Sequence, residues 1–130
     1  MTRLFLIALL VLSSGSAYAE WVDIGITTYD GATVYFDPDT IRRNGDRVKM
    51  WELDDFKTIQ TVASYSYLSS KVQREFDCTE ERMRVLEGTT FSGNMGNGQV
   101  VYAHSDENKW QPVELERSGK ALWIVACNKK

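Results

Sequence analysis

Two cysteines are the residues of this sequence with the widest chemical range. Cys78 ends the stretch "SSKVQREFDC", and Cys127 lies close to the end of the chain. A cysteine serves as a nucleophile, a metal ligand or half of a disulfide. A redox motif needs Cys-x-x-Cys, and a zinc site needs more Cys or His at short spacing, which the lone His104 does not supply. The leading interpretation is therefore that Cys78 and Cys127 form a disulfide.

The stretch His104-Ser105-Asp106 contains the three residue types of a hydrolytic triad. Neighbours in sequence point in different directions in a strand or a loop, whereas the nucleophile, the base and the group that orients the base must converge in space. We therefore predict no catalytic residue and a protein that is not an enzyme.

Glycine-rich and acidic stretches are two further features that could form phosphate or metal sites. A phosphate loop requires Gly-Lys-Ser/Thr at the start of a helix, but "GNMGNG" is followed by Gln99-Val100-Val101, which begins a strand. The acidic pairs lack the twelve-residue calcium loop with its central glycine. We interpret both features as turns and predict no cofactor and no metal ligand. The pairs are Asp37 and Asp39, Asp54 and Asp55, and Asp106 and Glu107.

Arg82 and Arg84 alternate with Met83 and Val85, so the two arginines share the outward face of a predicted strand. One interpretation is a solvated strand face, and the other is a basic patch that contacts a macromolecular partner. Large aromatic side chains also supply rigid contact area to interfaces, although most of them pack in cores or on sheet faces. These aromatic candidates are Trp51, Trp110, Trp123, Tyr65 and Tyr67.

Residues 1–19 have the organisation of a cleaved secretory signal peptide. A basic residue precedes the apolar run "LFLIALLVL", and "SAYA" places alanines at the minus-three and minus-one positions before Glu20. The nine-residue run is shorter than the roughly 20 residues of a membrane span, and no cysteine follows the cleavage site to carry a lipid anchor. We expect export to the periplasm or the medium, where the oxidising environment favours the disulfide.

Residues 20–130 have the length of one domain. The full chain carries 15 basic and 18 acidic residues, and loss of Arg3 with the signal peptide changes the formal charge from -3 to -4. An acidic chain does not favour nucleic acid as a partner, because phosphates attract basic surfaces.

Alternation with a period of two predicts a mainly antiparallel β domain. The end of the chain is different, because the run "ALWIVAC" is continuously apolar and the pattern leaves helix and strand open over residues 118–127. Ser118 would cap a helix, whereas Ile124 and Val125 favour a strand. The predicted strands lie near residues 21–28, 32–37, 47–56, 66–78, 81–92 and 98–104.

A set of short motifs, in order along the chain, resembles the surface-adhesin protein E family of bacteria. The match covers nearly all of the mature chain. The motifs are Trp21, Tyr35 with Asp37, Ile41, Trp51 with Leu53, Asp77-Cys78, Met95-Gly96 with Gly98, Trp110 with Pro112, and Cys127.

The resemblance implies an α+β fold in which a six-stranded antiparallel sheet carries a C-terminal helix, tied to one face by the disulfide. It also implies an envelope protein that binds a macromolecular partner. Some members of the family bind host matrix glycoproteins such as vitronectin and laminin. The adhesin that names the family is lipid-anchored, and this chain lacks the anchoring cysteine. The alternative function is a periplasmic module that senses a small ligand or inhibits an enzyme through a pocket between helix and sheet.

Overall fold

The computed structural model describes residues 20–105 and 109–128. The predicted signal peptide therefore lies outside the described residues, as does Asp106. Within the described ranges, no helix combines the length and the hydropathy that crossing a membrane requires.

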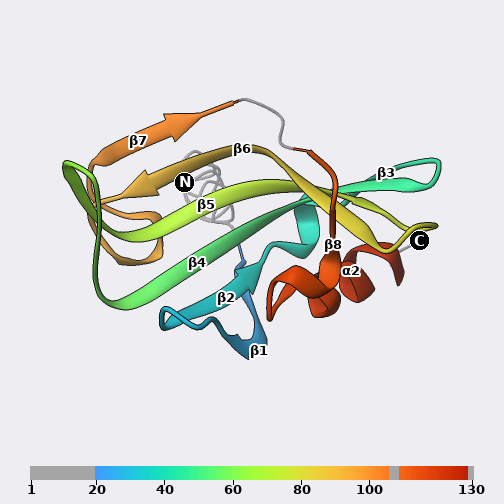
Figure 1. The fold of residues 1–130 in the computed structure, drawn as a ribbon, viewed down its shortest axis with the longest axis horizontal. Helices are drawn as coiled ribbons and strands as arrows, with labels where there is room; N and C mark the ends of the chain where they lie inside the picture. The colour runs from blue at the N-terminus through green and yellow to red at the C-terminus, as the bar shows by residue number, and fades with distance from the viewer. Residues whose placement is uncertain (1–19, 106–108, 129–130) are drawn as a thin grey trace, which may run out of the picture.

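One antiparallel sheet runs through the domain (Figure 1). Six strands form its continuous path in the order β1, β2, β4, β5, β6, β7, while β3 pairs with β4 and β8 pairs with β6. The predicted antiparallel sheet of about six strands is confirmed. The strands are β1 (Val22–Thr27), β2 (Ala32–Phe36), β3 (Arg42–Asn44), β4 (Arg47–Val62), β5 (Tyr65–Asp77), β6 (Arg82–Phe91), β7 (Val100–His104) and β8 (Gln111–Pro112).

The end of the chain is a helix, α2 (Gly119–Asn128), as the family resemblance implies. It buries Leu122 and Ala126 completely against the sheet, and Trp123 is partly buried beside them. The predicted disulfide joins Cys78, just after β5, to Cys127 in the last turn of α2, with 5.6 Å between the two Cα atoms. The α+β fold with a tethered C-terminal helix is thus confirmed.

The two faces of the sheet differ because side chains alternate along each strand. On β4, Val48 and Met50 are buried in the core beneath α2, whereas Arg47 and Lys49 are exposed on the opposite face. Among residues 20–105 and 109–128, the one α-helix packs on the core side, and we call the opposite face of the sheet the open face. A short connection, η3 (Val113–Leu115), leads from β8 into α2 and buries Val113 in the same core.

Two of the predicted turns lead into strands β2 and β4. Gly31 and Gly45 have φ angles of 88° and 63°, a conformation that glycine adopts without steric cost, and they close the turns before β2 and β4. The β4 strand is longer than the predicted segment 47–56, because it continues to Val62 before turning into β5. The short helix η1 (Pro38–Thr40) begins at Asp37, whose carboxylate accepts a hydrogen bond from the Asp39 amide.

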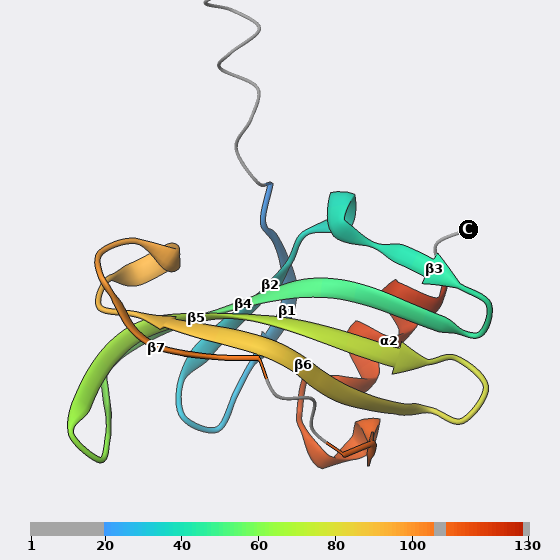
Figure 2. The same cartoon turned by 90° about the horizontal axis from the view of Figure 1, so that it is seen from above.

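The "GNMGNG" stretch forms the short helix η2 (Asn94–Gly96) at the other end of the long strands from α2 (Figures 1 and 2). The Asp55 carboxylate accepts hydrogen bonds from the Met95 amide and the Asn94 side chain. The Ser69 hydroxyl accepts one from the Gly96 amide. The glycine-rich stretch is therefore a turn packed on β4 and β5, as interpreted from the sequence.

Candidate partner-binding surface

Arg82 and Arg84 lie on the open face of β6, each opposite a carboxylate of β5. The strand register pairs Arg82 with Asp77 and Arg84 with Glu75. Arg82 donates from Nε to Asp77 Oδ2 at 3.0 Å, and its Nη2 forms an ion pair with the same oxygen at 3.0 Å. Arg84 donates to Glu75 Oε1 at 2.9 and 2.7 Å. The residues of the predicted basic patch are therefore positioned by charge-assisted bonds across two strands.

These carboxylates are more buried than the arginines that cover them. Glu75 and Asp77 are only 7% and 6% exposed, whereas the Arg82 side chain is 39% exposed. Burial by itself would raise the pKa of Asp77, but hydrogen bonds from Arg82 and from two backbone amides lower that pKa below its ordinary value. The charge of Asp77 thus holds Arg82 in a defined orientation at the surface.

Trp110 contacts these two arginines and also a third arginine, Arg47. The centre of its ring lies 4.8 Å from Cζ of Arg82, 4.5 Å from Cζ of Arg84 and 5.2 Å from Cζ of Arg47. These distances are typical of cation–π contacts, in which the guanidinium lies against the ring. Pairing of β8 with β6 places Trp110 there, because Pro112 is opposite Arg82. We call Arg47, Arg82, Arg84 and Trp110 the arginine–tryptophan cluster.

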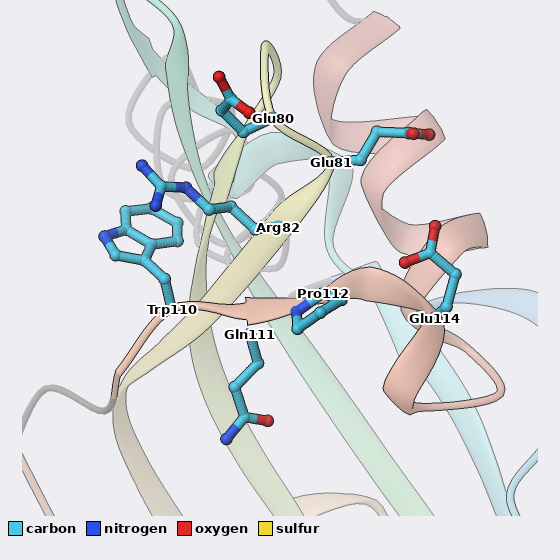
Figure 3. Close-up of a pocket in the computed structure, with 7 residues that line it drawn as sticks. All are labelled: Glu80, Glu81, Arg82, Trp110, Gln111, Pro112 and Glu114. Atoms are coloured by element: carbon cyan, nitrogen blue, oxygen red, sulfur yellow. The ribbon is translucent and has the colours of Figure 1, made fainter.

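A hollow of about 330 Å³ opens beside this cluster (Figure 3). In the close-up, Trp110 and Arg82 lie on one side, and Glu81 and Glu114 lie on the side nearer α2. Glu81 forms an ion pair with Lys120 of the helix. The surface therefore offers an aromatic and basic side next to an acidic side. The lining residues are Glu80, Glu81, Arg82, Trp110, Gln111, Pro112 and Glu114.

A second polar cavity lies on the helix side, between the sheet and the segment that leads into α2. Arg74 of β5 forms a buried ion pair with Glu52 of β4 and a second ion pair, at 2.8 Å, with the exposed Glu116. Asp54 lines the same cavity, and its Oδ1 atom is buried without a hydrogen-bond partner among the described residues. The cavity measures about 150 Å³, which is smaller than the roughly 300 Å³ at which pockets for drug-sized ligands begin.

The predicted aromatic candidates separate into different places. Trp110 belongs to the arginine–tryptophan cluster, and Trp123 donates from Nε1 to the Asp77 carbonyl oxygen at 2.9 Å, within the helix–sheet contact. Tyr65 and Tyr67 lie next to each other near the far end of the sheet, and the Tyr65 ring stacks on Tyr102 of β7 with 5.5 Å between centroids. No single platform unites them.

His104 and Ser105 lie at the end of β7, and the structure gives them no triad geometry to test because Asp106 is outside the described residues. The His104 ring lies over Gly88 of β6, where an added Cβ would come within 2.8 Å of Nε2. Across residues 20–105 and 109–128, no group of three His, Cys, Asp or Glu side chains is arranged to hold a metal ion.

The sequence pattern did not identify Arg47 as part of this surface, nor the contacts of three arginines with the Trp110 ring. Arg47 lies 35 positions before Arg82, and only the register of β4 on β5 and of β5 on β6 brings the two to one face. The alternation of Arg47 and Lys49 with buried Val48 and Met50 was a usable signal for the face, although it could not identify the neighbours.

Comparison with known proteins agrees with this architecture. The crystal form II structure of Haemophilus influenzae protein E matches with a TM-score of 0.61 and 10% identity, over 78% of this chain and 85% of that one. The selenomethionine form of that protein matches with a TM-score of 0.60 and 10% identity, over 78% of this chain and 84% of that one. At this identity the likeness establishes the fold alone.

A search of curated proteins finds no match. A family model described as surface-adhesin protein E matches residues 21–128, which is nearly all of the predicted mature chain. The chain therefore belongs to the surface-adhesin protein E family.

Proposed function

We propose that this protein is an exported, adhesin-like envelope protein that acts by binding a macromolecular partner through the arginine–tryptophan cluster. The supporting observation is the convergence of three guanidinium groups on Trp110 at an open sheet face. Tryptophan and arginine are the residue types that contribute most to binding energy in protein interfaces. Family membership supports the same class of function, with matrix glycoproteins as the first partners to examine.

Surface plasmon resonance on the exported chain tests this function. Vitronectin and laminin would be passed over wild-type protein, over the Arg82→Ala/Arg84→Ala variant and over His104→Ala. We expect the double arginine variant to bind at least about tenfold more weakly, a cost of roughly 1.4 kcal/mol. His104→Ala should bind like wild type, because His104 lies on β7 outside the cluster.

The arginine variant needs a control for folding, because it leaves Asp77 and Glu75 buried without their partners. Arg82→Lys/Arg84→Lys keeps both charges but loses the planar fork that bonds the carboxylates. Salt discriminates further: the difference between wild type and the alanine variant should shrink at high ionic strength, because exposed charges are then screened. Equal binding by all variants, or turnover of a substrate that is lost with His104→Ala, would contradict the proposal.

The cavity at Asp54 favours a second candidate, the small-ligand module. Its buried and unpartnered Oδ1 atom would accept a hydrogen bond from a small donor molecule. A thermal-shift screen with small amines and polyols, run on wild type and on Asp54→Ala, which removes the acceptor, tests this alternative. Saturable stabilisation that disappears in the variant, together with no glycoprotein binding, would favour it over the adhesin-like function.

A further inference from the structure

The open face carries two rows of charged side chains that cross four strands. Residues directly opposite each other in an antiparallel sheet share a face, so the register defines both rows. The first row is Arg42, Lys49, Glu75 and Arg84, and the second row is Asn44, Arg47, Asp77 and Arg82, each read from β3 through β4 and β5 to β6. We call these eight residues the basic face. It holds five basic and two acidic residues, although the whole chain has a formal charge of -3.

Both carboxylates of the basic face are engaged by the β6 arginines, as described above. Three cations remain that form no ion pair with any carboxylate in the part of the chain that the structure describes: Arg42, Arg47 and Lys49. Arg42 donates only to the carbonyl oxygens of Asp39 and Ile41, and Arg47 lies against Trp110. The β3–β4 end of the face therefore carries an excess of positive charge, because Glu75 and Asp77 are already paired with Arg84 and Arg82.

A cavity of about 270 Å³ lies at this end of the face, and cationic side chains dominate its lining. One of them, Arg43, donates at 3.1 Å to the carbonyl oxygen of Cys127, so the disulfide-bonded end of α2 holds one of its walls. Guanidinium and ammonium groups supply only hydrogen-bond donors, which suits an oxyanion. The lining residues are Arg42, Arg43, Asn44, Arg47, Lys49 and Glu75.

The spacing of the cations indicates a polymer rather than a single ion. Neighbouring strands lie about 4.8 Å apart, so the cations of the basic face span roughly 14 Å from Arg42 on β3 to Arg82 and Arg84 on β6. One sulfate or phosphate ion cannot reach across that width, whereas a chain with several oxyanions can. Arginine forks match such groups in a bidentate manner.

Trp110 distinguishes between polymers. Proteins that bind single-stranded nucleic acid stack bases on exposed aromatic rings. Here the Trp110 ring is already contacted by three guanidinium groups, so it does not offer an open stacking surface. A sulfated polysaccharide needs no such ring, because it is held by its sulfate groups. We propose that the basic face binds a sulfated glycan chain, with Arg42, Arg47 and Lys49 as the main contacts. This deepens the proposed function by naming the chemistry of the partner.

Binding to heparin oligosaccharide, measured by surface plasmon resonance on the exported chain over a salt series, tests the proposal. Arg47→Ala/Lys49→Ala removes two of the uncompensated cations. Its control, Lys57→Ala/Arg117→Ala, removes two exposed cations away from the basic face. We expect the first variant to bind at least about tenfold more weakly and the slope of log affinity against log salt to fall by about two, one for each lost contact. The control should change affinity by less than about twofold, because it removes charge without removing a contact.

A single variant, Lys49→Gln, guards against misfolding, because the Lys49 side chain is exposed and forms no hydrogen bond or ion pair with a described residue. It should weaken heparin binding while leaving the melting temperature unchanged. The inference is overturned if wild type does not bind heparin at low salt, if fully desulfated heparin binds equally well, or if the two double variants behave alike. Duplex DNA of equal charge that competes as well as heparin would also overturn the glycan assignment.

The two proposals can fail separately. Glycoprotein binding that is lost in Arg82→Ala/Arg84→Ala but persists without any heparin binding removes only the glycan inference. Heparin binding that depends on Arg47 and Lys49, without any glycoprotein binding, removes only the glycoprotein partner.

Discussion

At the scale of single residues, the most unusual group is the carboxyl of Asp54. Burial raises its pKa well above the ordinary value, and the neighbouring Glu52 carboxylate raises it further. Arg74 acts in the opposite direction but is already bonded to Glu52 and Glu116. For Glu52 burial also raises the pKa, but the charge of Arg74 and the hydrogen bonds with Asp54 and Arg74 together lower that pKa below its ordinary value. The Asp54 carboxyl therefore keeps its proton to higher pH than the neighbouring Glu52 carboxyl does.

Asp54→Asn tests this assignment. Because the folded-state pKa of Asp54 is raised, the folded protein holds its proton to higher pH than the unfolded chain does, and stability is lost as pH rises through the folded pKa. The variant removes this loss, so its free energy of unfolding should exceed that of wild type increasingly from about pH 4 upward. Urea denaturation at a series of pH values measures the difference.

The exposed carboxylate of Asp39 provides the matched control. Asp39→Asn removes the same charge without a buried neighbour, so its effect on unfolding should stay within about 0.5 kcal/mol, as for an ordinary surface substitution. If Asp54→Asn is less stable than wild type at neutral pH, the Asp54 carboxylate is ionised and stabilising, and the assignment is wrong.

At the scale of elements, α2 is held on the sheet by contacts that gather at its last two turns. The Cys78–Cys127 disulfide, the bond from Trp123 to the Asp77 carbonyl and the bond from Arg43 to the Cys127 carbonyl all join α2 to the ends of β3 and β5. This end of the sheet also carries the basic face. The helix therefore supports, from beneath, the strands that present the binding residues above.

Cys78→Ser/Cys127→Ser should lower the free energy of unfolding by about 4 kcal/mol, because the disulfide closes a loop of 49 residues in the unfolded chain. Urea denaturation of the variant, and of wild type with and without reductant, measures the loss. Thiol titration of the unfolded, unreduced protein should find no free cysteine. Two titratable thiols would show that the disulfide does not form, and a loss below about 1 kcal/mol would show that its cross-link contributes little to stability.

At the scale of the whole molecule, charge is distributed unevenly. A chain with an excess of acidic residues concentrates five basic side chains on one sheet face and leaves acidic side chains around the hollow beside Trp110. Local potential, more than net charge, sets which partner is attracted to a surface. The sequence-based expectation against nucleic acid rested on the net charge of the chain, which does not describe the local charge of this face.

Export is the prediction that belongs to the whole chain. If residues 1–19 are a signal peptide, the mature protein isolated from the producing bacterium should begin at Glu20. N-terminal sequencing and mass spectrometry of the periplasmic and medium fractions would establish this. Protease treatment of intact cells would separately report surface display. An uncleaved chain confined to the cytoplasm would contradict both the export and the disulfide arguments.

The sequence by itself determined the features that a local pattern of residues can specify. Period-two alternation located the six strands of the continuous path but not β3 or β8. Asp30-Gly31 and Asn44-Gly45 marked turns, and the count of two cysteines allowed only one pairing. It could not decide α2, because a short and continuously apolar run carries no period. The family resemblance identified this segment as a helix, and the packing of Leu122 and Ala126 on the sheet explains why the helix forms.

Only the tertiary structure decided the surfaces. Arg47, Arg82 and Trp110 come from three separate segments, and they meet because strand register places them on one face. A shift of one residue would turn each side chain to the opposite face. The pKa of Asp54 likewise depends on its burial and on Glu52, Arg74 and Glu116, which the fold brings together around it. Alternation along a strand is a local property that sequence records, whereas register and burial result from packing of the whole chain.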